Sequence, residues 1–358
     1  MRTEILRADS GDLLKICERA AAVWEAGGLV AFPTETVYGL GADGLSETAA
    51  SRIYAAKNRP SDNPLILHIG RKEDLAPLVR VVPGSAEKLM DAFWPGPLTM
   101  VLPKADIVPF ETTGGLSTVA VRMPSHPVAN ALLKSTRVPI AAPSANLSGR
   151  PSPTRAAHVI EDMDGRIDLI VDGGDVGIGL ESTIVDLSGE IPVLLRPGYI
   201  TREMLSEVLG EVLMDPAVTK DAIIHRVEVS GTPKAPGMKY RHYAPKAPLT
   251  VVYGDPVRTA ERISSLADER TAVIAPEEHI HLYTRGHVLP MGRLSDPESV
   301  ARDLYDVLRT CDAINASRIY AEDFTEADMG GAVMNRLLKA AGGNYVSEEE
   351  LNRGGCGK

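Results

Sequence analysis

The spacing of hydrophobic positions predicts an alternation of strands and helices over most of the chain. In the first 28 residues Ile16, Ala20 and Trp24 recur at helical spacing, and a short strand precedes them. Apolar runs bounded by Pro, Gly or polar residues then predict strands within 29–32, 65–67, 98–103, 119–123, 138–142, 169–172, 181–187 and 193–198. Helical segments are predicted at about 47–57, 86–93, 127–135 and 202–209, with a further helix after Thr154 as its cap.

The pattern changes after residue 210. Five prolines interrupt 211–248, and a dense aromatic and basic cluster lies between them at 238–243. This segment is either a plain tether or a linker that also touches the ligand. From residue 249 strands (249–253, 272–275, 287–290, 317–321) alternate with helices (256–266, 296–310, 331–341), which predicts a Rossmann-like parallel sheet. The predicted division is a catalytic domain at 1–210, a linker contacting the active site at 211–248, a second domain at 249–345 and a tail at 346–358.

Composition narrows the protein class. The chain has 358 residues with 24% charged side chains, as in soluble globular proteins. The net charge of −10 argues against broad nucleic-acid binding, although a local basic cleft remains possible. Three scattered cysteines favour a reducing compartment, and neither a signal peptide nor an apolar membrane span is expected. We therefore expect a cytoplasmic protein.

Two cations two residues apart, Lys57 and Arg59, follow a predicted helix and are surrounded by turn formers. They form either a clamp for phosphate or carboxylate, or a solvated helix end. Arg122 stands in an apolar strand, where an unpaired charge is costly. It therefore pairs with an internal acid or meets an anionic ligand. His68, the only histidine close in sequence to the two cations, is either structural or a ligand contact.

Familiar single motifs do not explain the chain. Residues 39–44 match G-x-G-x-x-G, but Asp62 precedes the next strand instead of ending it, so a tight turn is favoured over a dinucleotide site. A Walker phosphate loop, H-E-x-x-H and C-x-x-C are absent. The polar groups at strand ends suit a reaction that needs positioning and charge neutralisation, such as nucleotidyl transfer.

Eight ordered motifs resemble the threonylcarbamoyl-AMP synthases of the YrdC-like fold. They are Phe32-Pro33-Thr34-Glu35-Thr36-Val37-Tyr38-Gly39-Leu40-Gly41, Lys57-Asn58-Arg59-Pro60, Asn63-Pro64-Leu65, Trp94-Pro95-Gly96-Pro97-Leu98-Thr99, Val121-Arg122-Met123-Pro124, Ala142-Pro143-Ser144-Ala145-Asn146, Glu181-Ser182-Thr183-Ile184 and Leu195-Arg196-Pro197-Gly198. The segment 235–245 and the predicted second domain resemble the long, two-domain form of the family. The resemblance implies a twisted mixed sheet with flanking helices, together with the smaller parallel α/β domain.

The resemblance also implies an activity. Such an enzyme condenses L-threonine, bicarbonate or CO₂ and ATP to threonylcarbamoyl-AMP and pyrophosphate, for modification of tRNA beside the anticodon. Its threonine site would be lined by Thr36, His68, Arg122, Ala142 and Ser182. Its ATP site would be lined by Lys57, Arg59, Asn63, Thr118, Ser144, Ser152, Arg196 and Tyr240. Mg²⁺ would be held mainly by the ATP phosphates, and no residue is assigned as a general base.

Two rival functions share this fold. A non-catalytic RNA-binding module is disfavoured by the acidic net charge and the ATP-sized set of hydroxyls. A carbamoyltransferase of the hydrogenase-maturation type would carry zinc-finger cysteines, which three scattered cysteines do not provide. The expected partners are ATP, L-threonine, bicarbonate and a downstream tRNA-modifying transferase complex, without stable nucleic-acid or membrane binding.

Overall fold

The computed structural model describes residues 2–8, 12–227, 233–236, 242–327, 329 and 331–352, and its described part divides into two compact units. The first unit reaches Ser148, resumes from Ser152 to Asp215, and includes 233–236. The second unit holds Gly149–Pro151, Pro216–Val227 and the described residues from His242 onward. The domain boundaries expected at 210/211 and 248/249 stay predictions.

The first unit is built on an 11-stranded sheet in the order β1-β8-β2-β3-β7-β4-β6-β5-β9-β10-β11. Parallel and antiparallel pairs are mixed, so the predicted mixed sheet is confirmed. Its strands are β1 (Glu4–Arg7), β2 (Val30–Phe32), β3 (Gly39–Asp43), β4 (Ile66–His68), β5 (Leu98–Pro103), β6 (Thr118–Arg122), β7 (Ile140–Ala141), β8 (Leu169–Asp172), β9 (Thr183–Asp186), β10 (Val193–Arg196) and β11 (Leu213–Met214).

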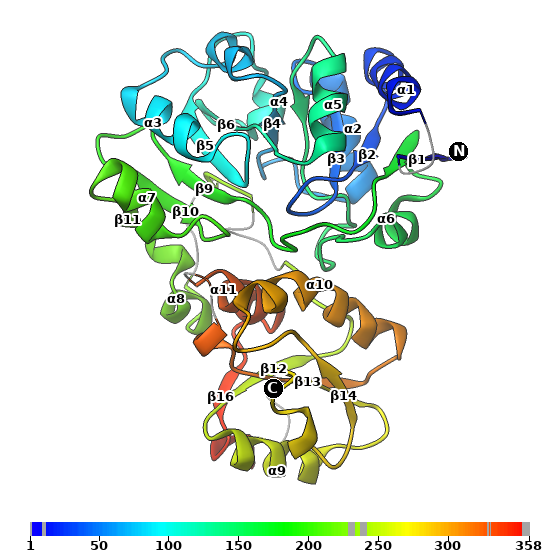
Figure 1. Cartoon of the computed structure of the whole chain (residues 1–358), viewed down its shortest axis with the longest axis vertical. Coiled ribbons are helices and arrows are strands. Elements are labelled where there is room, and N and C mark those ends of the chain that lie inside the picture. Colours follow the sequence, from blue (N-terminus) through cyan, green and yellow to red (C-terminus); the bar gives the residue numbers. More distant parts are fainter. Residues whose placement is uncertain are drawn as a thin grey trace. The chain divides into compact units, whose positions relative to one another are not determined.

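Helices flank this sheet, and α1 packs against α5 (Figure 1). The helices are α1 (Leu13–Glu25), α2 (Glu47–Lys57), α3 (Gly84–Phe93), α4 (Phe110–Thr113), α5 (Pro127–Ser135), α6 (Ala156–Met163) and α7 (Arg202–Leu209). The periodic apolar residues of α1 are buried, among them Ile16, Ala20 and Trp24, as their spacing predicts. The expected cap at Thr154 was wrong, because α6 begins one residue later and takes Arg155 as its N-cap.

Most of the glycine-rich segment 39–44 is the strand β3 (Gly39–Asp43), and Gly44 directly follows it. A Cβ atom on Gly41 would lie 2.6 Å from Ile140 Cγ2, and one on Gly44 would lie 2.3 Å from Leu67 Cδ2. These positions need glycine because neighbouring side chains fill the space above the strand. The expected tight turn is therefore wrong for 39–43, because this stretch is extended, but the need for residues without a side chain is confirmed at Gly41 and Gly44.

The second unit has a five-stranded sheet in the order β14-β13-β15-β12-β16, and every pair is parallel. The strands are β12 (Leu249–Tyr253), β13 (Thr271–Ala275), β14 (His287–Pro290), β15 (Arg318–Glu322) and β16 (Tyr345–Ser347). Helices α10 (Pro297–Ala313) and α11 (Ala332–Ala340) cover one face, and α9 (Pro256–Leu266) covers the other (Figure 1). The predicted Rossmann-like alternation is confirmed, and β16 is an additional strand.

A short helix, α8 (Lys220–Ile224), precedes this sheet in the chain and belongs to the same unit. Its Lys220 Nζ lies 3.2 Å from Asp323 Oδ2 and 2.8 Å from Tyr345 Oη, above the Tyr345 ring. Part of the expected linker is thus a folded element of the second unit. Across the described residues, the structure holds no helix with the length and apolar character needed to cross a membrane.

Candidate active site

The candidate site lies where several strands of the first sheet end. Arg122 is the last residue of β6, and His68, the last residue of β4, is opposite it in the parallel register. Ser182 directly precedes β9, and Arg196 ends β10 beside it, where Arg196 pairs with Ile184. Side chains that are far apart in sequence are therefore brought to one edge of the sheet.

Arg122 is the most strongly engaged side chain in this group. It is 4% exposed, and its Nη2 lies 2.7 Å from Glu35 Oε1. Its Nη1 donates to Thr36 Oγ1 at 2.8 Å. Burial raises the pKa of Glu35, but the charge and hydrogen bond of Arg122 outweigh burial, and the carboxyl pKa ends below its ordinary value. Of the two alternatives for Arg122, this structure shows pairing with an internal acid, Glu35.

His68 is buried beside this ion pair and is neutral. Burial, and then the charge of Arg122, lower its pKa to about 3. Its Nδ1 lies 3.0 Å from the carbonyl oxygen of Ile66 and therefore carries the proton that this bond requires. The ring meets Phe32 edge to face, with centroids 6.2 Å apart. His68 thus adds no charge to the site.

The buried His68 is expected to make the protein less stable as pH falls. The unfolded chain takes up a proton near the ordinary histidine pKa of about 6.5, whereas the folded chain keeps His68 neutral down to about pH 3. The folded state loses at most about 1.4 kcal/mol for each pH unit within that window through this group. Urea unfolding of the protein and of His68→Gln at pH 7, 5.5 and 4.5 measures the difference. Equal pH slopes for the two proteins would contradict the assignment.

Ser182 connects the residues expected around threonine with those expected around ATP. Its hydroxyl lies 2.7 Å from Thr99 Oγ1 and accepts a bond from Arg196 Nη2 at 3.1 Å. Arg196 Nε also donates to the Ser182 carbonyl at 2.9 Å. The guanidinium of Arg196 is thereby fixed in a buried position at the end of its strand.

Lys57 is buried rather than placed on a solvated helix end. It is 1% exposed, and its ammonium group donates to the backbone carbonyls of Ser144 and Asn146. Ser144 Oγ in turn donates to Asn146 Oδ1 at 2.5 Å. Lys57 therefore holds the loop after β7, and this loop carries one of the hydroxyls expected at ATP.

Arg59 is half-buried and directs its guanidinium to the turn just after it in the chain. Its Nη2 donates to the carbonyls of Asn63 and Pro64, both at 3.2 Å.

Ser152, another residue expected at ATP, is bonded to an acid. Its Oγ donates to Glu181 Oε1 at 2.6 Å, and both residues are buried.

The remaining predicted residues are less tightly grouped. Ala142 comes directly after β7, and its amide donates to the Ile66 carbonyl at 2.9 Å. Thr118 begins β6, so it lies about 13 Å along the strand from Arg122, at about 3.3 Å per residue. Tyr240 lies outside the described residues.

Three polar partners of the site were not assigned from the sequence: Glu35, Thr99 and Glu181. Glu35 lies between two threonines in a segment where a carboxylate facing a pocket was expected. The sequence therefore indicated its position, but not its pairing with Arg122. Thr99 lies in β5 and is opposite Arg122 in the register. The only signal for these residues is their place inside the recognised motifs.

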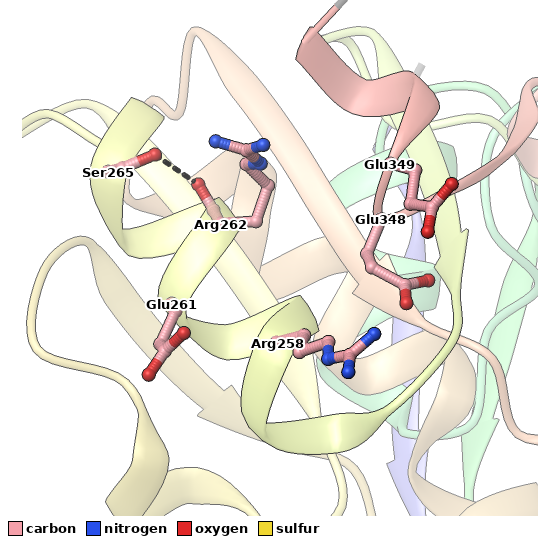
Figure 2. A pocket seen from close by; sticks show the side chains of 6 residues that line it. All are labelled: Arg258, Glu261, Arg262, Ser265, Glu348 and Glu349. Carbon is pink, nitrogen blue, oxygen red and sulfur yellow. Dashed lines mark hydrogen bonds between the residues drawn. The ribbon is translucent and has the colours of Figure 1, made fainter.

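The second unit has a surface pocket of its own. This cavity of about 330 Å³ is lined by Arg258, Glu261, Arg262, Ser265, Glu348 and Glu349 (Figure 2). Two cations and three acids share it, and the one hydrogen bond drawn there joins Ser265 Oγ to the Arg262 carbonyl. None of the predicted site residues lines this pocket.

Two family descriptions match the chain. The family described as "Telomere recombination" matches residues 22–198. The family described as "Threonylcarbamoyl-AMP synthase, C-terminal domain" matches residues 200–342. Together they span both units.

Full-length relatives agree with these matches. The threonylcarbamoyl-AMP synthase of Bacillus subtilis is 48% identical over 335 residues, which are 92% of this chain and 93% of the relative. That of Pyrococcus abyssi is 49% identical over 90% and 93% of the two chains. The crystal structure of P. abyssi Sua5 complexed with L-threonine has a TM-score of 0.88 at 45% identity and covers 97% of this chain and 99% of its own. The two families, the relatives and the shared fold lead to one conclusion: the chain belongs to the threonylcarbamoyl-AMP synthase family.

Proposed function

We propose that this enzyme joins L-threonine, bicarbonate and ATP into threonylcarbamoyl-AMP with release of pyrophosphate, at the edge of the first sheet. The observation that carries this assignment to the site is the buried Arg122 beside Thr36 and the neutral His68. A guanidinium in that setting suits a small carboxylate. The relative from P. abyssi, which has been crystallised with L-threonine, supports the choice of amino acid.

The proposed threonine site consists of Thr36, His68, Arg122, Ala142 and Ser182. Arg122 binds the carboxylate, and the hydroxyls of Thr36 and Ser182 are placed near it by their hydrogen bonds to the two arginines. His68 presents an uncharged ring that neither repels nor attracts a second charge. Ala142 supplies a small side chain where the amino acid would pack.

The proposed ATP site consists of Lys57, Arg59, Asn63, Thr118, Ser144, Ser152, Arg196 and Tyr240. Arg59 and Arg196 neutralise phosphate charge, and the hydroxyls donate hydrogen bonds. Lys57 acts through the loop of Ser144, whose carbonyl its ammonium group binds. These residues carry hydroxyl, amide, ammonium and guanidinium groups, and the carboxylate beside them is that of Glu181, which Ser152 binds. Mg²⁺ is therefore proposed to be held mainly by phosphate oxygens. When bound, this ion neutralises part of the triphosphate charge.

The chemistry is proposed to proceed in two steps. The threonine ammonium group and bicarbonate give a carbamate, one water and one proton that passes to solvent. A carbamate oxygen then attacks the α-phosphorus, and the bond from that phosphorus to the bridging oxygen of pyrophosphate breaks. Both steps depend on placing the reactants together, which the convergence of strand ends at this edge supports.

The product is proposed to pass to a transferase complex that modifies tRNA beside the anticodon, in the cytoplasm. Stable binding of nucleic acid by this chain is not expected because its net charge is −10.

Pyrophosphate release with all three substrates tests the proposal. We expect release only when ATP, threonine and bicarbonate are present together, and threonylcarbamoyl-AMP in stoichiometric amount. Omission of threonine is the control. A well-folded sample that releases no pyrophosphate but binds RNA would instead support the non-catalytic module.

A further inference from the structure

The Glu35–Arg122 ion pair is the one charged pair among the described residues of the proposed threonine site. Its two side chains are not equally buried, since Arg122 is 4% exposed and Glu35 is 12% exposed. The guanidinium also donates hydrogen bonds to Thr36 Oγ1 at 2.8 Å and to the Gly96 carbonyl at 3.4 Å. Glu35 Oε2 accepts from the His126 amide at 3.4 Å, and backbone hydrogen bonds from Ser125 and Glu35 also stabilise the carboxylate. The carboxylate is the more exposed of the two partners.

The two histidines beside this pair add no charge to it. His68 is neutral, with its pKa lowered to about 3 by burial and then by Arg122. Burial also lowers the pKa of His126, so this neighbour too is uncharged at neutral pH. The ion pair itself therefore presents one cation and one anion to the ligand.

This balance decides which ligand fits. A ligand with a carboxylate alone places two anions around one guanidinium in a site with little water, and an uncompensated buried charge is strongly unfavourable. An amino acid brings an ammonium group with its carboxylate. Two cations and two anions then alternate, and each oxygen and nitrogen keeps an oppositely charged neighbour.

We propose that Glu35 binds the ammonium group of the amino acid while Arg122 binds its carboxylate, so that the ion pair selects a zwitterion. This assignment rests on the proposed function of the site. It makes Glu35 a specificity-determining residue that touches substrate, beyond its role as the partner of Arg122. After carboxylation the substrate nitrogen carries a negatively charged carbamate. Glu35 repels this carbamate toward the cationic phosphate site.

The experiment compares L-threonine with (R)-3-hydroxybutyrate, which is threonine without its amino group. Binding of both compounds to the wild-type protein, to Glu35→Gln and to the control Glu87→Gln, an exposed residue of α3, is measured by calorimetry. We expect the wild type and the control to prefer threonine by about 100-fold, as expected when a buried charge is left without a partner. Glu35→Gln is expected to reduce this preference to about tenfold or less by weakening threonine binding and preserving or strengthening hydroxybutyrate binding.

Two results would overturn the proposal. Equal weakening of both ligands in Glu35→Gln would mean that Glu35 only orients Arg122, and unchanged affinity for both ligands would mean that Glu35 does not meet the ligand. Thermal melting and ATP binding of each variant show that the fold and the nucleotide site are retained. Failure of the wild type to bind threonine or release pyrophosphate would instead count against the proposed function.

Discussion

Replacing Arg122 with alanine is expected to lower threonine affinity by about 100- to 1,000-fold, while ATP affinity changes by less than about threefold. The change removes the cation proposed to bind the substrate carboxylate. It also leaves Glu35 without its partner in a buried position, and breaking a buried ion pair in this way typically costs about 3–5 kcal/mol. Titration calorimetry with each substrate alone separates the two affinities, and pyrophosphate release reports their joint effect.

Arg59→Ala is the matched comparison for Arg122→Ala. Arg59 is bonded to the backbone of Asn63 and Pro64 and lies in the proposed ATP site, so its loss is expected to weaken ATP use much more than threonine binding. A second control, the Arg122→Met/Glu35→Gln double variant, removes both charges and leaves no buried ion alone. If Arg59→Ala and Arg122→Ala weakened both substrates equally, the proposed division between the two sites would be wrong.

Lys57→Met is expected to destabilise the protein by about 3 kcal/mol and to weaken ATP binding with it. The methionine fills a similar volume but donates nothing, so the buried carbonyls of Ser144 and Asn146 lose their ammonium donor. The loop carrying the Ser144 hydroxyl then loses its anchor. Chemical denaturation gives the stability change, and nucleotide titration gives the affinity change.

The exposed Lys88, on helix α3, provides the control for Lys57→Met. Lys88→Met removes the same charge from the surface and is expected to change stability by no more than about 0.5 kcal/mol. Equal stability of the two variants would show that the Lys57 ammonium group contributes nothing to holding the loop.

The periodicity of the sequence predicted most elements because each carries its own pattern. Helix α2 was predicted at its observed bounds of Glu47–Lys57, and the alternation after residue 249 predicted four of the five strands of the second sheet. The strand β16 was missed because it has three residues, all half-buried, and so gives neither an apolar run nor a clear alternation.

The partners within the site could not be predicted because they depend on contacts distant in sequence. Thr36 and Arg122 are 86 positions apart, and Lys57 is 87 positions from Ser144. A pattern of single residues showed that Arg122 needed an anion, but not that Glu35 supplies it. The turn formers beside Lys57 are compatible with both a clamp and an exposed helix end, and only the loop after β7, whose carbonyls bind its ammonium group, explains why this lysine is buried.

The hydroxyl of Ser182 has a consequence for how the two substrates affect each other's binding. This hydroxyl belongs to the proposed threonine site and accepts a bond at 3.1 Å from Arg196, a residue of the proposed ATP site. A first substrate that fixes this hydroxyl spares the second the same loss of freedom, and linkage makes the benefit equal in both directions. We therefore expect the two substrates to be thermodynamically coupled through this oxygen atom, so that each raises the affinity of the protein for the other.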